Sequence, residues 1–179
     1  GKAVAEAADA GRLVGLVEEG IELARTLARG LYPVEMEAEG LMRAFGDLAG
    51  TISQGAKVRC VFECDSPVLI QDNAVATHLY RIAQEAVRNA VRHAKARRIG
   101  INLVEQAGQV KLTVEDDGVG MLESSPAGDG LGVRIMAYRA ALIGGTFNIE
   151  PAPTGGTMVT CAFPKSPAPA APAHAHDES

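Results

Sequence analysis

Residues 84–121 constrain the fold most, because a helical pattern, a strand pattern and a glycine-rich turn follow one another there. From Gln84 to Lys95, no Gly or Pro interrupts a run of good helix formers. Four polar residues in this run have the spacing i, i+4, i+7 and i+8 and therefore share one stripe of an α-helix: Glu85, Asn89, Arg92 and His93. Apolar residues, mostly Ala and Val, cover much of the remaining surface. This predicts a helix that packs on a core and forms one wall of a polar pocket.

The second half of the stretch predicts the opposite wall. Alternating apolar and polar residues from Val110 onward indicate a strand that ends at Asp116. Gly118 and Gly120 follow at once, and they let the backbone turn sharply and approach a ligand closely. An aspartate at this position can accept a hydrogen bond from a buried donor, such as the exocyclic amine of a purine.

Hydrophobic patterns predict further elements around these two walls. Helices are expected at residues 12–31, 37–49, 73–95 and 130–141. Strands are expected at residues 57–63, 66–70, 99–103, 110–116, 146–150 and 157–164. Asp72 is a suitable N-cap for the third helix, and Gly144 with Gly145 ends the fourth. Residues 118–130 lack periodicity and predict a loop.

Composition excludes several function classes. A formal net charge of −5 argues against direct binding to nucleic acid, which needs a concentrated basic surface. No apolar run approaches the length of a membrane span, so we expect a cytoplasmic domain without membrane contact of its own. Cys60, Cys64 and Cys161 have no metal-binding spacing and are interpreted as reduced thiols. The chain begins at Gly1 rather than Met, which we interpret as a fragment of a longer protein, one that a membrane anchor could still hold.

The order of these motifs resembles the N box and the glycine boxes of the GHKL ATPases. The matching segments are Glu85-x3-Asn89-x2-Arg92-His93-Ala94, Asp116-x-Gly118-x-Gly120, Gly128-x-Gly130-Leu131-Gly132 and Gly155-Gly156-Thr157. Within that superfamily, residues 20–164 are most similar to the ATP-binding domain of bacterial sensor histidine kinases. Two segments, LYRIAQEAVRNAVRHA and GLGVRIMAYRAALIGG, are similar to sequences of the subfamily that signals to LuxR-type response regulators.

The resemblance implies a binding site for ATP and Mg²⁺. It makes Glu85 the general base and Asn89 the magnesium ligand, while Arg92 and His93 match basic positions that face the phosphates. Asp116 matches the aspartate that takes the adenine amine, with Thr157 assisting through water. The remaining matches contribute to the adenine platform, the lid hinge and the phosphate contacts: Gly118, Gly120, Gly128, Gly130, Leu131 and Gly132.

The resemblance also implies an α/β fold, the two-layer α/β sandwich of the Bergerat ATP-binding type, with a mixed sheet and helices on one face. The expected domains are residues 1–33, part of a dimerisation and phosphotransfer helix region, residues 34–164, the catalytic domain, and residues 165–179, a low-complexity disordered tail. The helix that carries the phosphoacceptor histidine in this family has no counterpart in the chain. We therefore expect no autophosphorylation by it alone, and we expect residues 12–31 to self-associate or to be disordered.

The function implied is transfer of the γ-phosphoryl group of ATP to a histidine, and from there to an aspartate of a response regulator, within a full-length homodimer. Two alternatives stay open. The domain could be a non-catalytic module whose nucleotide state controls dimerisation or a partner. It could also be an ATP-hydrolysing relative of the mismatch-repair or chaperone ATPases. Phosphohistidine formation on an acceptor helix supplied in trans would separate the kinase from both.

Overall fold

The computed structural model describes residues 40–56, 58–120, 130–153 and 155–165. Its elements in chain order are α2 (Gly40–Gly55), β1 (Arg59–Glu63), α3 (Asn73–Asn89), a π-helical turn (Ala90–Ala94), β2 (Arg98–Gln106), β3 (Gln109–Asp116), α4 (Leu131–Leu142), β4 (Thr146–Pro151) and β5 (Thr157–Pro164). The expected helix at residues 12–31, Gly128 and the expected disordered tail after residue 165 lie outside the described residues.

The strands form one mixed five-stranded sheet in the order β1-β2-β3-β5-β4. β1 runs parallel to β2, with Arg59 opposite Arg98, and the connection between them passes through α3. The other neighbours are antiparallel, and Val114 of β3 lies opposite both Ile101 of β2 and Val159 of β5. β3 therefore occupies the centre of the sheet, and its C-terminal end is held from both sides.

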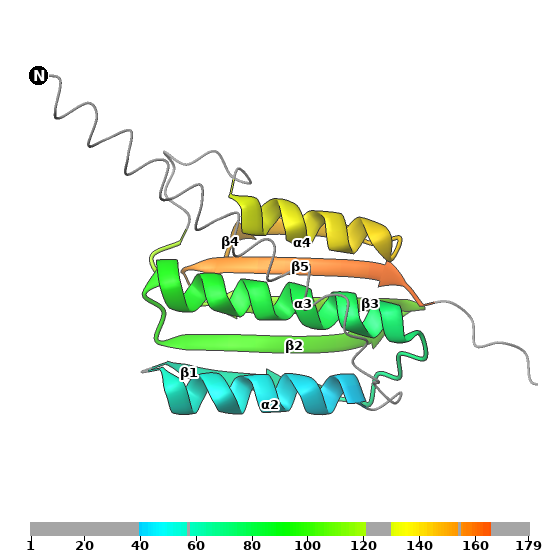
Figure 1. Ribbon diagram of the computed structural model, residues 1–179, viewed down its shortest axis with the longest axis horizontal. Coiled ribbons are helices and arrows are strands. Elements are labelled where there is room, and N and C mark those ends of the chain that lie inside the picture. The colour runs from blue at the N-terminus through cyan, green and yellow to red at the C-terminus, as the bar shows by residue number, and fades with distance from the viewer. Residues whose placement is uncertain (1–39, 57, 121–129, 154, 166–179) are drawn as a thin grey trace, which may run out of the picture.

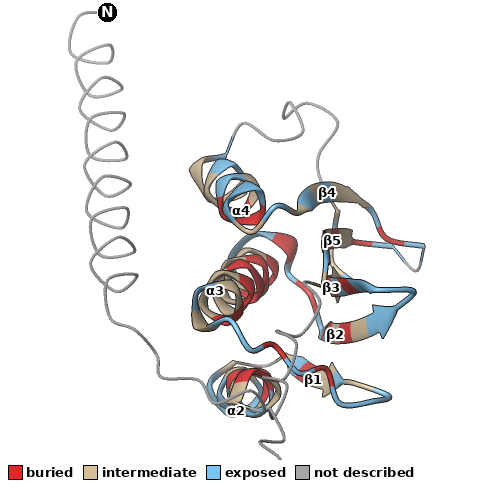
Figure 2. Ribbon diagram, turned by 90° about the vertical axis from the view of Figure 1, so that its right-hand side faces the viewer, coloured by how far each residue is buried: buried red, intermediate tan, exposed pale blue. Residues whose placement is uncertain are grey.

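The helices α2, α3 and α4 lie side by side over one face of the sheet, with α3 in the middle (Figure 1). Viewed along the helices, the fold is two layers, with the buried sides of the helices turned toward the strands (Figure 2). The structure confirms the expected α/β sandwich with a mixed sheet and helices on one face. None of the described helices combines the length and apolarity needed to cross a membrane.

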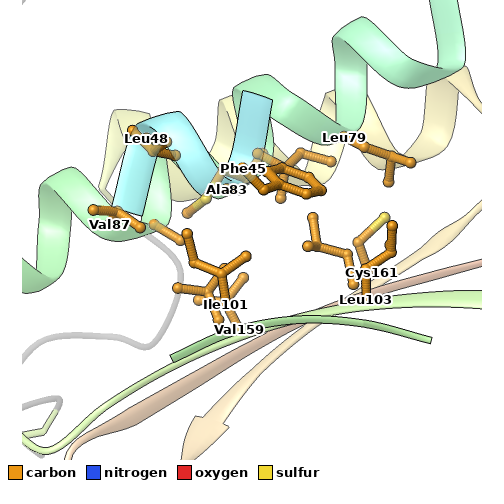
Figure 3. Close-up of a cluster of buried hydrophobic side chains, with 14 of the residues drawn as sticks. Phe45, Leu48, Leu79, Ala83, Val87, Ile101, Leu103, Val159 and Cys161 are labelled. Carbon is orange, nitrogen blue, oxygen red and sulfur yellow. The ribbon is translucent and has the colours of Figure 1, made fainter. Parts of the chain in front are cut away.

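Aliphatic side chains from both layers meet between the helices and the sheet (Figure 3). Phe45 of α2 is fully buried, with its ring 5.4 Å from that of Phe62 and 6.2 Å from that of Tyr80. Leu79 of α3 and Leu103 of β2 are also fully buried. The alternation of apolar residues along β2 and β3 produces this core because one face of each strand points toward the helices.

Several local predictions are confirmed. Asp72 caps α3, since its Oδ1 accepts hydrogen bonds from the backbone N–H groups of Ala74 at 2.8 Å and Val75 at 3.3 Å. The β2–β3 hairpin turns at Ala107 and Gly108, both with positive φ. Gly144, with φ of +67°, follows the end of α4, and its lack of a side chain makes that left-handed conformation inexpensive.

The strand predicted at residues 66–70 is wrong. This segment has no ladder partner and runs as an irregular connection from β1 to α3. Val68 and Ile70 are nevertheless buried in the core, which explains the alternating pattern. Pro67 cannot donate a ladder hydrogen bond. β1 pairs with β2 on one side only. The alternating pattern at residues 66–70 therefore reflects burial of side chains rather than a strand.

The helix predicted at residues 73–95 is present, but its last turn is π-helical rather than α-helical. The α-helix ends at Asn89, the turn Ala90–Ala94 follows, and Lys95 closes it in a left-handed conformation. Ala90 and Ala94 are both buried, so the wider turn keeps small side chains on the core. The assumption of 3.6 residues per turn therefore fails beyond Asn89, and the single stripe of four polar residues is not continuous. α2 extends to Gly55, beyond the predicted end at residue 49.

The three cysteines are unpaired, as expected. Burial raises the pKa of the Cys60 thiol and of the Cys161 thiol to about 11 in each case. Both therefore stay protonated at neutral pH and pack as small apolar side chains.

Replacing Phe45 by Ala should lower the free energy of unfolding by about 3–5 kcal/mol, because it removes a fully buried ring that contacts two other aromatic rings. Urea denaturation of the full chain measures this change. Tyr138→Ala is the matched control, since that ring is 65% exposed and its loss should change stability by only about 0.5 kcal/mol. Equal effects of the two substitutions would contradict the position of Phe45 in the core.

Candidate functional site

Four segments that are distant in the sequence converge at one end of the domain. The C-terminal end of α3, the end of β3, the start of α4 and the start of β5 lie together there (Figure 1). Three glycine contacts record this convergence: Gly118 with Ala94, Gly132 with Glu85, and Gly156 with Asp116. The predicted site residues on described segments are therefore gathered at this end.

Asp116 is the last residue of β3 and is only 7% exposed. Its Oδ1 accepts a hydrogen bond of 2.8 Å from the backbone N–H of Gly118. Burial raises the pKa of the Asp116 carboxyl, while backbone N–H groups of Gly118 and Thr157 act in the opposite direction. A buried carboxylate held by backbone donors is a fixed acceptor, suited to a ligand N–H group.

Glycines let backbone segments pack closely around Asp116. A Cβ on Gly156 would overlap the backbone of Asp116, and a Cβ on Gly118 would overlap Ala94. Gly120, with φ of +73°, lies close to Gly156, and a Cβ there would approach Gly156 O to 3.3 Å. Backbones from three segments thus meet where any side chain would separate them.

Glu85 and Asn89 lie on the side of α3 that faces the start of α4. A Cβ on Gly132 would overlap Glu85 Oε1 and would lie 3.5 Å from Asn89 Nδ2. The glycine lets α4 begin against these two side chains. Asn89 is half-buried, and its carboxamide makes no capping hydrogen bond to the π-helical turn that it precedes.

The start of α4 presents backbone donors to the same space. Gly130 is the N-cap and provides no side-chain capping bond, and its carbonyl oxygen accepts from Val133 and Arg134. The N–H groups of Leu131 and Gly132 belong to the first helical turn, where no intrahelical acceptor exists. Such a helix start favours anions.

Arg92 and His93 lie in the π-helical turn, and both are exposed. Arg92 lines a groove on the outer side of the helix layer together with Glu85. His93 does not line that groove. The π-helical turn thus separates Arg92 from His93, although α-helical spacing predicted both on one face with Glu85.

Sequence reasoning missed the partner of Glu85. Arg88 Nη2 lies 2.8 Å from Glu85 Oε2 and also donates to Oε1, and the Glu85 side chain is 13% exposed. The i, i+3 spacing of the two residues on one helix was the available signal. Asp117 stabilises the turn after β3, since its Oδ1 accepts hydrogen bonds from the backbone N–H groups of Arg97 at 2.7 Å and Arg98 at 2.8 Å.

Comparison with known proteins identifies relatives of this arrangement. Residues 74–167, just over half of the chain, match the sequence model of the family described as histidine kinase-, DNA gyrase B- and HSP90-like ATPases. The chain is 30% identical over 154 residues to the oxygen sensor histidine kinase NreB of Staphylococcus carnosus, covering 86% of this chain and 44% of NreB. It is 29% identical over 133 residues to the nitrate/nitrite sensor protein NarQ of Escherichia coli, covering 74% of this chain and 24% of NarQ. The chain thus spans less than half the length of either relative.

Solved structures agree on the fold. The histidine kinase domain of the blue-light activated kinase of Erythrobacter litoralis EL346 is 25% identical, with a TM-score of 0.57, over 70% of this chain and 59% of that one. The ATP-binding domain of PrrB from Mycobacterium tuberculosis is 22% identical, also with a TM-score of 0.57, over 69% of this chain and 93% of that one.

The neighbouring residues Asp116 and Asp117 should respond to pH in opposite ways. Burial raises the pKa of Asp116, so ionisation of its carboxyl opposes folding. The free energy of unfolding of Asp116→Asn relative to wild type should therefore increase as pH rises through the raised pKa. The pKa of Asp117 is lowered by the N–H groups of Arg98 and Arg97, so its ionisation favours folding. Asp117→Asn should therefore destabilise at neutral pH and lose this effect as pH falls through the lowered pKa. Thermal unfolding between roughly pH 3 and 8, the range in which carboxyls complete their titration, measures how the stability of each variant relative to wild type changes with pH. Changes of the same sign for the two variants would contradict the opposite pKa shifts of Asp116 and Asp117.

Proposed function

Because the chain belongs to the family of histidine kinase-, DNA gyrase B- and HSP90-like ATPases, we propose that its described domain binds ATP with Mg²⁺ and acts as the catalytic part of a sensor histidine kinase. The observation that carries this proposal is the convergence of a buried acceptor, Asp116, with the glycine-lined start of α4 at one end of α3. A nucleotide needs both features, because its base must be recognised and its phosphates must be neutralised.

Asp116 would recognise the adenine. Its carboxylate is oriented by the N–H group of Gly118, and an oxygen can accept the exocyclic amine of the base. Gly120 and Gly156 let backbone segments pack closely beside Asp116, and a flat ring would lie against this backbone surface. Thr157, at the start of β5, provides a backbone N–H that acts on the Asp116 carboxyl, and its hydroxyl would assist at the base through a water molecule.

The phosphates would lie between Asn89 and the start of α4. Mg²⁺ takes few protein ligands and retains water and phosphate oxygens, so one amide oxygen from Asn89 fits its requirements. Among the described residues no three His, Cys, Asp or Glu side chains gather as an alternative metal site. The N–H groups of Leu131 and Gly132 would bind phosphate oxygens. When bound, the cation would offset the phosphate charge.

Glu85 would act on the group that attacks the γ-phosphorus. In a kinase, a nitrogen of the acceptor imidazole forms the new bond to phosphorus, the bond from phosphorus to the bridging oxygen breaks, and ADP leaves. Glu85 would accept the proton from the other imidazole nitrogen or orient the ring. Arg88 is a positioning residue here, since its ion pair with Glu85 fixes the carboxylate next to the phosphate site.

The remaining partners follow from this proposal rather than from the domain alone. We infer that the full-length protein is a homodimer that passes the phosphoryl group to an aspartate of a response regulator of the LuxR type. The match to NreB and NarQ supports this pairing, since both are sensor proteins. We place the domain in the cytoplasm, where ATP is available.

Calorimetric titration of ATP with Mg²⁺ into the full chain should show binding. Asp116→Ala should weaken it about thirtyfold or more, because a charge-assisted hydrogen bond to the base is lost. Asn89→Ala should abolish the difference in affinity between Mg²⁺ and EDTA buffers. Asp47→Ala, an exposed acidic residue on α2, is the control and should bind as wild type. Undiminished binding by Asp116→Ala would exclude the proposed adenine contact.

An acceptor helix supplied in trans tests the reaction. Phosphohistidine should form from ATP with wild type, and Glu85→Gln should lower its rate about a hundredfold or more while leaving ATP affinity within about twofold. Release of phosphate without phosphohistidine would favour the hydrolysing ATPase, and ATP binding without either product would favour a nucleotide-controlled interaction module. Either result would overturn the kinase proposal.

A further inference from the structure

Two contacts between α3 and α4 determine how these neighbouring helices pack (Figure 1). Next to the candidate site, Gly132 lies so close to Glu85 that a Cβ on the glycine would overlap Glu85 Oε1. At the second contact, Arg139 Nη1 lies 3.5 Å from His78 Nδ1. His78 precedes Glu85 by seven residues, and Gly132 precedes Arg139 by seven. Seven residues make about two turns of an α-helix, so both contacts lie on the facing sides of antiparallel helices.

The second contact joins a buried cation to an imidazole. Arg139 is only 8% exposed, and His78 is half-buried. A guanidinium has donors and no acceptor, so Nδ1 of His78 must supply the lone pair. Only a neutral imidazole with its proton on Nε2 meets this requirement. The contact therefore requires one protonation state and one tautomer of His78.

Protonation of His78 replaces this hydrogen bond by repulsion. An imidazolium has a donor at each nitrogen, so its Nδ1 no longer accepts from Arg139. Two cations are then 3.5 Å apart. Salt screens charges weakly where a side chain is largely buried. The part of α4 that carries Arg139 is therefore pushed away from α3.

The surrounding charges act on both members of the contact. Burial and the charge of Arg139 lower the pKa of His78, while the charge of Asp72, which caps α3, acts in the opposite direction. Arg81 adds positive charge next to Arg139, and Glu85 offsets part of it. These are the charged groups that face the contact from α3, from its cap and from α4. His78 is therefore neutral at neutral pH, and it becomes protonated below the ordinary histidine value of about 6.5.

α4 connects this contact to the candidate site. Gly132, in the first turn of α4, packs against Glu85 and Asn89. Met136, in the middle of the helix, is fully buried and holds α4 on the core. Because a helix is rigid over this length, a displacement at Arg139 tilts α4 about its buried middle. The tilt changes the spacing between the first turn of α4 and the two polar side chains of α3.

We propose that His78 and Arg139 form a proton-sensitive contact that sets the position of α4 and, through it, the affinity of the candidate site for nucleotide. With neutral His78, α4 is held on α3 and its first turn is in place to bind phosphates. With protonated His78, α4 tilts and the affinity falls. The domain thus releases nucleotide as its surroundings become acidic. The effect on nucleotide rests on the proposed function, whereas the effect on α4 does not.

Hydrogen exchange of the α4 amides in the full chain tests the contact without nucleotide. His78→Gln is the informative variant, because its carboxamide oxygen can accept from Arg139 and does not titrate. Exchange in α4 should be equal in wild type and His78→Gln at roughly pH 7.5. At roughly pH 5.5 it should be at least about fivefold faster in wild type. Comparison at equal pH cancels the intrinsic pH dependence of exchange.

The amides of α2 are the internal control for this comparison, and they should exchange equally in the two proteins at both pH values. Equal exchange of α4 in wild type and His78→Gln at the acidic pH would overturn the proposal. So would a difference that is as large in α2 as in α4, because it would report a general loss of stability.

Histidine NMR tests the pairing itself. The His78 signal is the one that His78→Gln lacks, and nitrogen-15 spectra at neutral pH should show its ring protonated on Nε2. Arg139→Gln removes the neighbouring cation, so the pKa of His78 should rise. Arg43→Gln removes an exposed arginine of α2 and should leave the titration of His78 unchanged. A ring protonated on Nδ1, or a titration that Arg139→Gln does not alter, would overturn the proposal. The tautomer and the exchange comparison need no Arg139 variant, so they decide even if Arg139→Gln does not fold.

Calorimetric titration with ATP and Mg²⁺ extends the test to the candidate site. ATP itself titrates in this range, so wild type is compared with His78→Gln at each pH. Their affinities should agree at roughly pH 7.5, and wild type should bind at least about fivefold more weakly at roughly pH 5.5. Equal affinities at both pH values would overturn the effect on nucleotide. A chain that shows the α4 exchange difference but binds no ATP at either pH would leave the contact standing and overturn the proposed function.

Discussion

The backbone hydrogen bond from Val119 N–H to the Ala94 carbonyl oxygen, 2.8 Å long, joins the helix layer to the exit of the central strand. Gly118 makes it possible, since a side chain there would overlap Ala94. The bond fixes the end of α3 relative to the end of β3. Together with the bonds from Arg97 and Arg98 to Asp117, this connection sets the distance between Asn89 and Asp116.

The central helix α3 has three sides with different neighbours. Its inner side, with Leu79, Ile82 and Val87, packs on the sheet. The side toward α4 presents Glu85 and Asn89 to the start of that helix. Its outer side lines the groove. Glu85 lies at the border of the last two surfaces, where it forms an ion pair with Arg88.

Much of the fold and of the site could be predicted from the sequence because the signals are local. The spacing of Glu85 and Asn89 requires only a helix, and the succession of Asp116 and Gly118 requires only a strand followed by a tight turn. The π-helical turn could not be predicted, since it depends on Ala94 meeting a backbone from another segment. The same holds for Arg139, whose burial results from the packing of α4 on α3. The prediction at residues 66–70 failed because burial of Val68 and Ile70 imitates a strand pattern without a strand partner.

The pairing of β3 with β5 has a consequence for the order in which the molecule assembles. Gln109 lies opposite Pro164, so these strands join residues further apart along the chain than any other pair in the described sheet. The described domain thus consists of an early half ending at β3 and a late half beginning at α4. Pairing β3 with β5 closes the loop between these halves, which is entropically slow relative to forming the β2–β3 or the β4–β5 hairpin. Asp116 and Asn89 come from the early half, whereas Gly132, Gly156 and Thr157 come from the late half. A chain emerging from the ribosome therefore has no complete candidate site until β5 has docked.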